Sequence, residues 1–99
     1  MAQFDVHRLR SGRGLVIDCQ ADLHRDLPTR FVVPLISADS PWATNARLAP
    51  RFSIGEEQLV MATHFAATIA HRDLGPVVET LSEESYRITG AIDALVAGV

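Results

Sequence analysis

Apolar and polar residues alternate near the start of the chain, as they do along a half-buried β-strand. In the stretch QFDVHRL, Phe4 and Val6 lie on one side of the predicted strand. Asp5 and His7 lie on its other side. The turn-forming residues SGRG follow, and the β-branched run LVIDCQ then restores the apolar pattern. Together these stretches predict a β-hairpin that turns at Gly12-Arg13-Gly14.

The middle of the chain predicts further short strands. The stretch RFVVPLI, residues 30–36, is apolar enough for a central strand, but Pro34 removes a ladder donor and predicts an edge position or a bulge. Residues 37–50 are rich in turn formers and are expected to be irregular, with short strand pieces. The stretch RFSIGEEQLVMATHF predicts a second hairpin that turns at Gly55-Glu56-Glu57. The stretch after it predicts short strands that are broken at Asp73, Gly75 and Pro76.

The last segment changes to the period of a helix. Ser82 is a candidate N-cap, and Glu83 and Glu84 in the first turn complement the helix dipole. Thr80 and Glu83 form a competing capping box. Apolar residues then recur at positions i, i+4, i+7, i+8 and i+11, which predicts one packed stripe along the helix. This stripe consists of Ile88, Ile92, Leu95, Val96 and Val99.

These elements predict a single, mostly β domain over residues 1–99, with an antiparallel sheet closed by one C-terminal helix. A length of 99 residues suits one compact domain and is too short for two. The hydrophobic content of 47% supports a real core. A domain of this size buries a modest fraction of its surface, so dimerisation would help it.

Composition favours a cytoplasmic protein. No apolar run approaches the length of about 18 residues that spans a membrane, and the start lacks the apolar region of a signal peptide. The single Cys19 excludes an internal disulfide and suits a reducing compartment. The formal charge of -3 argues against a broad basic footprint for nucleic acid. Five arginines are therefore interpreted as solvated positions on strand edges and turns: Arg8, Arg10, Arg13, Arg25 and Arg30.

No catalytic, metal or cofactor site is predicted. Alternation places the neighbours of Cys19 on the opposite face, so this thiol has no partner base and is interpreted as a buried small hydrophobe. Asp18 and Asp22 share a strand face, but about 13 Å at about 3.3 Å per residue is too far for a carboxylate pair. The four histidines lack the spacing of metal ligands: His7, His24, His64 and His71.

Five segments follow one another in a recognisable order. They are QFDVHRL at the start, IDCQADL at 17–23, RFVVPL at 30–35, LAPRFSIGEE at 48–57 and LSEESYRITGAIDALVAGV at the end. The D-x-Q-A-D segment, the R-x-x-V-P-L strand and the glycine before the last residue form a moderately specific ordered set. This order resembles that of the CcdB family, the toxin half of a bacterial toxin–antitoxin module. The resemblance covers nearly the whole chain with few gaps.

The resemblance implies an SH3-like barrel with an antiparallel sheet, a small second sheet and one C-terminal α-helix. It implies a homodimeric, non-enzymatic toxin whose target is the A subunit of DNA gyrase. The toxin would insert at the dimer interface of this target and trap the cleaved-DNA complex. The resemblance also implies a cognate antitoxin whose disordered segment wraps the toxin and releases gyrase. The toxin–antitoxin complex would repress its own operon, so operator DNA would be bound only through that complex.

The resemblance also implies which residues contact gyrase. The family uses its last three residues, Trp-Gly-Ile, which correspond to Ala97, Gly98 and Val99. A family asparagine on the same helix corresponds to Asp93, which shares a helix face with Ala97 because the two are four residues apart. Tyr86 and Gly90 continue this face toward the start of the helix. A pair of family isoleucines after the D-x-Q-x-D segment corresponds to Leu23 and His24.

Two alternatives remain open at this point. The first is a non-toxic homologue that binds the antitoxin or another partner without poisoning gyrase. The second is an RNA-cleaving toxin of the same fold, against which the net charge and the lack of a positioned acid–base pair both weigh. An RNA site of this kind would be lined by Arg13, His24, Thr29 or Arg30.

Overall fold

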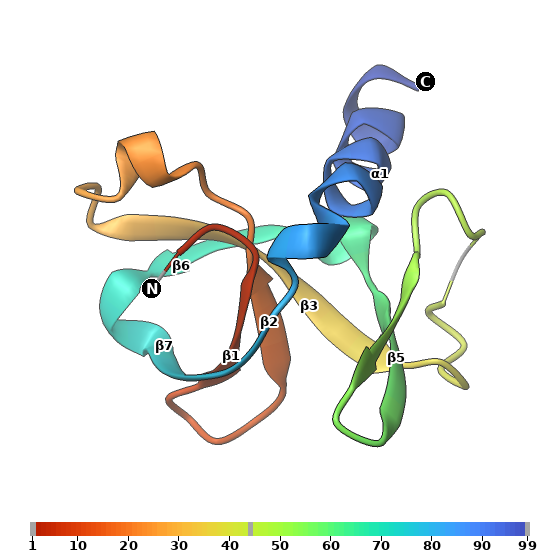
Figure 1. Ribbon diagram of the computed structural model, residues 1–99, viewed down its shortest axis with the longest axis horizontal. Helices are drawn as coiled ribbons and strands as arrows, with labels where there is room; N and C mark the ends of the chain where they lie inside the picture. Colours follow the sequence, from red (N-terminus) through yellow and green to blue (C-terminus); the bar gives the residue numbers. More distant parts are fainter. Residues whose placement is uncertain (1, 44, 99) are drawn as a thin grey trace.

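The computed structural model describes residues 2–43 and 45–98, and β-strands make up most of its regular structure (Figure 1). The strands are β1 (Asp5–Leu9), β2 (Leu15–Asp18), β3 (Thr29–Ser37), β4 (Arg51–Ile54), β5 (Glu57–Met61), β6 (Ala67–Ala70) and β7 (Leu74–Thr80). The α-helix α1 (Ser85–Ala97) follows them, and four short 3-10 turns connect elements: η1 (Asp22–His24), η2 (Thr63–Phe65), η3 (His71–Asp73) and η4 (Ser82–Glu84). None of the described helices is long and apolar enough to cross a membrane.

The strands form one curled antiparallel sheet. Its order is β4-β5-β3-β2-β1-β7, and β6 pairs with the first half of β3. In the described part of the chain the two end strands do not pair with each other, so the sheet is a half-barrel. The predicted small second sheet is the β4–β5 hairpin, which stays joined to the main sheet because β5 pairs with residues 35–37 of β3. The predicted mostly β fold with one C-terminal helix is confirmed.

Both predicted hairpins form, because their turns contain residues that tolerate a left-handed backbone. Gly12 and Gly14 have φ angles of 84° and 80° between β1 and β2. Gly55 has a φ of 62° at the second turn, where Ile54 pairs with Glu57. The second turn therefore consists of two residues, and Glu57 already belongs to β5.

Pro34 lies in the centre of the sheet, so the predicted edge position or bulge is wrong. It pairs in register with Val16 of β2. Its carbonyl accepts a hydrogen bond from the Ala62 N–H, 2.8 Å away, and therefore points away from β2. The ring nitrogen of Pro34 points to the same side of β3. On this side, residues 29–32 pair with β6 and residues 35–37 pair with β5, so Pro34 belongs to neither ladder. Proline is tolerated there because β3 changes partner at this position and needs no N–H donor.

β1 lies between β2 and β7 in the sheet, and its side chains are buried on both faces. Val6 is fully buried in the main core, while His7 on the opposite face is only 3% exposed. The His7 Nδ1 donates to the Gly75 carbonyl, 2.9 Å away. Gly75 itself allows a close backbone approach, since a Cβ there would lie 2.5 Å from the Arg8 carbonyl oxygen.

The predicted break at Gly75 and Pro76 is wrong, because both residues lie inside β7. The break occurs earlier, at η3, where residues 71–73 form a 3-10 turn between β6 and β7. The β1–β7 ladder instead shifts its register between His7 and Leu9, opposite the glycine and proline. A bulged ladder of this kind accommodates a proline that cannot donate.

A buried ion pair lies on the second face of the sheet. Arg30 and Asp18 are both fully buried, and the carboxylate Oδ2 lies 2.5 Å from one guanidinium nitrogen and 3.1 Å from Nε. Asp18 pairs in register with Val32, which belongs to a small apolar cluster with Val16 and Leu74. The interpretation of Arg30 as a solvated residue is therefore wrong, because its side chain is fully buried and paired with Asp18.

The helix begins later than its sequence signals predict. Neither Ser82 nor Thr80 caps it, because residues 82–84 form η4 and α1 starts at Ser85 without a side-chain capping bond. Its other end is capped by Gly98, whose φ is 74° and whose N–H donates to the Ala94 carbonyl at 3.0 Å. This is the left-handed ending that glycine favours.

The predicted packed stripe is only partly packed. Ile88 is fully buried in the main core, and Ala91 and the half-buried Ile92 pack beside it. Leu95 and Val96 are 44% and 80% exposed, so the prediction for them is wrong. The reason is geometric, because α1 rises away from the sheet and its last turns have no strand beneath them (Figure 1). Val99 lies outside the described residues.

Cys19 lies directly after β2 and is 7% exposed in the main core, as its sequence position predicts. Burial, together with the negative charge of Asp18, raises the pKa of the Cys19 thiol from 9.0 to about 12. A nucleophilic thiol needs a lowered pKa, so this residue serves packing.

The raised thiol pKa predicts a loss of stability in alkaline solution. Above pH 9.0 the thiol ionises in the unfolded chain but keeps its proton in the folded one, until the pH reaches about 12. The free energy of unfolding should therefore be unaffected by this group below pH 9.0, and should then fall by about 1.4 kcal/mol per pH unit. Urea unfolding across this range measures the slope. Cys19→Ala is the control, and equal alkaline slopes for the two proteins would contradict the prediction.

Candidate functional site

The end of α1 is an exposed surface that extends beyond the sheet (Figure 1). Asp93, Ala97 and Gly98 are exposed there, and none of them belongs to the hydrophobic core. Tyr86 is 87% exposed near the start of the helix, and Gly90 is exposed between them. The helix face that the sequence predicts is therefore open to a partner along its whole length.

The second predicted contact is the turn η1. Leu23 is 86% exposed, which is unusual for a large apolar side chain, and His24 is exposed beside it. Hydrogen bonds hold the turn in shape, because the Asp22 Oδ1 accepts from the Gln3 N–H at 2.9 Å. The Gln20 side-chain amide donates to the His24 carbonyl at 2.8 Å. η1 is thus a fixed turn that presents an apolar side chain.

The structure does not bring the two predicted contacts together within one chain. In Figure 1, η1 lies at the upper left and the end of α1 at the upper right, with the sheet below and between them. Val99 lies outside the described residues, so its position relative to Gly98 is not described. The predicted site residues thus fall into two separate groups on this chain.

Exposed apolar side chains also occur beside α1, on the turn η2 that packs against it. Phe65 in η2 is 43% exposed, and Trp42 packs edge-on against it with ring centroids 5.7 Å apart. Trp42 is itself 62% exposed. Together with Leu95 and Val96, these aromatic rings add apolar surface to the side of the molecule that carries the helix end.

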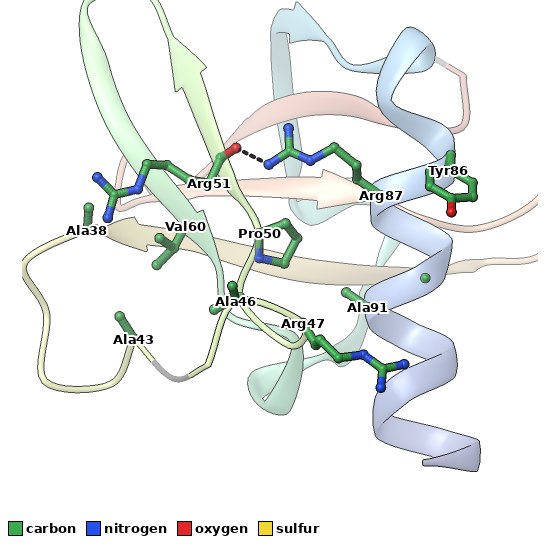
Figure 2. A pocket seen from close by; sticks show the side chains of 12 residues that line it. Ala38, Ala43, Ala46, Arg47, Pro50, Arg51, Val60, Tyr86, Arg87 and Ala91 are labelled. Carbon is green, nitrogen blue, oxygen red and sulfur yellow. Dashed lines mark hydrogen bonds between the residues drawn. The ribbon is translucent and has the colours of Figure 1, made fainter. Parts of the chain in front are cut away.

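A groove runs between α1 and the irregular segment that leads into β4 (Figure 2). Its volume is about 680 Å³. Its apolar lining includes Pro50, Val60 and Ala91, and three arginines stand around it. The sequence analysis did not predict this groove, although the clustering of alanines and arginines in residues 38–51 is a signal that could have indicated it. The groove reaches the predicted helix face, because Tyr86 and Gly90 also line it.

The structure argues against the RNA-cleaving alternative. Arg30, one of its four candidate residues, is fully buried and paired with Asp18, so it cannot reach a substrate. Arg13 lies in the β1–β2 turn and His24 in η1, so the exposed candidates sit on different loops. Among the described residues, no group of three histidine, cysteine or acidic side chains is placed to hold a metal ion.

Comparison with known proteins identifies the family of the chain. A search of curated proteins finds no match. A family model described as CcdB protein matches residues 3–98. The match includes η1, the central strand and α1, which are the elements that carry the resemblance in the sequence. Members of this family act by binding DNA gyrase rather than by catalysis, and their partners are gyrase A and an antitoxin. The chain therefore belongs to the CcdB family, the gyrase-poisoning toxins of toxin–antitoxin systems.

Proposed function

We propose that the end of α1 and the turn η1 form the gyrase contact of this toxin. The residues are Leu23, His24, Asp93, Ala97, Gly98 and Val99. The exposure of Leu23 carries this proposal, because a large apolar side chain at 86% exposure on a fixed turn has no role in the fold. The open face of α1 supports it, because Asp93 and Ala97 are both exposed on the last turns of the helix.

The toxin is proposed to act as a homodimer. Leu95 and Val96 are exposed at the end of α1, and the exposed rings of Trp42 and Phe65 lie on neighbouring segments. A second copy packed against this side would remove much of this apolar surface from water. A two-fold dimer would also present two copies of each contact group, which suits a target that is itself dimeric.

We further propose that the toxin works in the cytoplasm, where gyrase is found, and that a cognate antitoxin neutralises it. Operator DNA would then be bound through the toxin–antitoxin complex. The acidic net charge of -3 supports this indirect mode, because the toxin lacks the broad basic surface that direct DNA binding requires.

Induction of the protein in bacteria tests the proposed gyrase contact. The intact toxin is expected to arrest growth and to increase gyrase-dependent DNA cleavage, while a variant that lacks residues 97–99 should do neither. Val78→Ser is a control, because Val78 is an exposed apolar residue on β7, outside the proposed contact. Circular dichroism checks that the shortened chain still folds.

The outcomes separate the remaining possibilities. Growth arrest that survives removal of residues 97–99 would place the gyrase contact elsewhere. An intact toxin that neither arrests growth nor binds gyrase A, yet binds its antitoxin, would overturn the proposal in favour of the non-toxic homologue.

A further inference from the structure

A small cavity lies where the β1–β2 hairpin meets η3 and the start of β7. Its volume is about 300 Å³, which is at the lower end of the usual range for ligand pockets, about 300–1,000 Å³. The start of β7 supplies an apolar wall, which consists of Leu74, Pro76 and Val77. A cavity of this size suits a small ion better than a large organic ligand.

The polar side chains of the cavity are basic, although the protein is acidic overall. His7 and Arg10 line it from β1 and the hairpin, and His71 and Arg72 line it from η3. No acidic residue lines it within the part of the chain that the structure describes. Asp73 follows Arg72 in η3, but it lines a different cavity. Because the whole chain carries a formal charge of -3, this cavity is a local reversal of sign that favours an anion.

The two arginines offer hydrogen-bond donors in different ways. The Arg10 Nε donates to the Arg72 carbonyl at 2.6 Å, and one of its terminal nitrogens donates to the Leu74 carbonyl at 3.2 Å. A guanidinium group carries five N–H donors, so these two bonds fix the group and leave other donors free. The side chain of Arg72 makes no hydrogen bond or ion pair within the described residues. Both arginines are exposed, so an anion can reach them.

His7 adds a buried acceptor to this basic cavity. It is only 3% exposed, and its Nδ1 donates to the Gly75 carbonyl, 2.9 Å away. A carbonyl oxygen can only accept, so the neutral imidazole has its proton on Nδ1 and a lone pair on Nε2. This Nε2 is buried and has no hydrogen-bond partner among the described residues. Buried polar atoms are nearly always hydrogen-bonded, so Nε2 points to a ligand that brings its own donor.

We propose that this cavity binds inorganic phosphate. The anionic oxygens of phosphate would accept hydrogen bonds from Arg10 and Arg72, because the guanidinium fork matches the geometry of this ion. Its P–O–H group would donate to the His7 Nε2. In neutral solution phosphate keeps at least one such group, whereas sulfate and the phosphodiesters of nucleic acids have none. A phosphate monoester loses its second proton with a pKa of about 6, so it is mostly without the group as well.

This site is independent of the proposed gyrase contact. None of the proposed contact residues that the structure describes lines the cavity, which lies on the hairpin and η3 rather than on α1 or η1. A bound phosphate would join the hairpin to η3, which are distant in the sequence. Because the unfolded chain lacks this arrangement, phosphate should also stabilise the folded protein.

Isothermal titration of the full chain in a neutral buffer at constant ionic strength tests the proposal. The probes are inorganic phosphate, sulfate, adenosine monophosphate and a single-stranded DNA oligonucleotide. Phosphate should bind at least about tenfold more tightly than sulfate, because a site that accepts a hydrogen bond from an O–H group discriminates against an ion without one. The nucleotide and the DNA should bind no better than sulfate.

Two variants locate the site. Arg72→Gln should weaken phosphate binding by about tenfold or more, because it removes a charged donor that makes no other contact. Arg13→Gln is its matched control, since Arg13 is an exposed arginine in the β1–β2 turn that does not line the cavity. His7→Asn keeps an N–H donor for the Gly75 carbonyl but has no atom at the place of Nε2. It should bind phosphate and sulfate with nearly equal affinity, and circular dichroism checks that it folds.

Several results would overturn the proposal. Equal affinities of the native protein for phosphate and sulfate would reduce the cavity to a non-selective anion site. Tighter binding of the nucleotide or the DNA would assign the arginines to an organic phosphate. Absence of phosphate binding, or an equal loss in Arg13→Gln and Arg72→Gln, would show that phosphate does not occupy this cavity. The comparison of phosphate with sulfate on the native protein decides the matter even if His7→Asn does not fold.

Discussion

The Arg30→Ala variant is expected to lose about 3–5 kcal/mol of unfolding free energy, the largest stability effect that we predict. Removing the guanidinium leaves the Asp18 carboxylate fully buried without its ion-pair partner, which is 2.5 Å away in the native protein. A small domain has a total stability of only about 5–15 kcal/mol, so the variant should be close to unfolding. Urea unfolding followed by circular dichroism measures the change.

Two comparisons test the cause of this loss. The double variant Asp18→Leu, Arg30→Met should recover most of the lost stability, because replacing both partners of a buried pair by apolar groups removes the uncompensated charge. Glu84→Gln removes a partner from the exposed pair with Arg87 and should cost less than about 1 kcal/mol. If Arg30→Ala cost no more than Glu84→Gln, the buried ion pair would contribute little to the fold.

The Ala97→Trp variant is expected to bind gyrase A about 30-fold more tightly than the native toxin, a gain of about 2 kcal/mol. The resemblance places the family tryptophan at this position, and aromatic anchors often dominate binding hot spots. Ala97 is exposed at the end of α1, so the larger side chain should not disturb the core. Titration of a labelled gyrase A fragment measures the affinity, and the DNA cleavage assay measures the gain in poisoning.

Glu56→Trp is the matched control for this gain. It places the same aromatic side chain at the exposed β4–β5 turn, outside the proposed gyrase contact, and should leave the affinity unchanged. An Ala97→Trp toxin with native affinity would show that gyrase does not contact this position. A similar gain in both variants would instead point to non-specific apolar binding.

The strands and turns were predictable because their signals are local. The hairpin turn at residues 12–14 follows from two glycines, and the structure gives Gly12 and Gly14 the positive φ angles that glycine accepts most readily. The burial of Cys19 followed in the same way from its place in an apolar run. The local signal at Pro34 led to a wrong prediction of an edge position or a bulge. The sheet accepts proline there because β3 changes partner between β6 and β5 at this residue.

The candidate site was predictable only in part. Leu23 and Asp93 were identified through the family resemblance, and their exposure is consistent with that role. The apolar stripe of the helix led to a wrong prediction for Leu95 and Val96, because periodicity shows which side of a helix is apolar but not how far the sheet extends beneath it. The groove arises where a turn segment passes α1, and the clustering of alanines and arginines in residues 38–51 is only an indirect signal of that approach between distant segments.

The sequence by itself determined the mostly β class, the two hairpins, the C-terminal helix and, through the order of its segments, the CcdB family. These features depend on period, turn chemistry and motif order, which are all properties of neighbouring residues. The tertiary structure decided that Arg30 is buried against Asp18, that the end of α1 is exposed, and that Arg47, Arg51 and Arg87 surround one groove. Each of these depends on contacts between distant segments, because burial and charge clustering are set by how the elements pack.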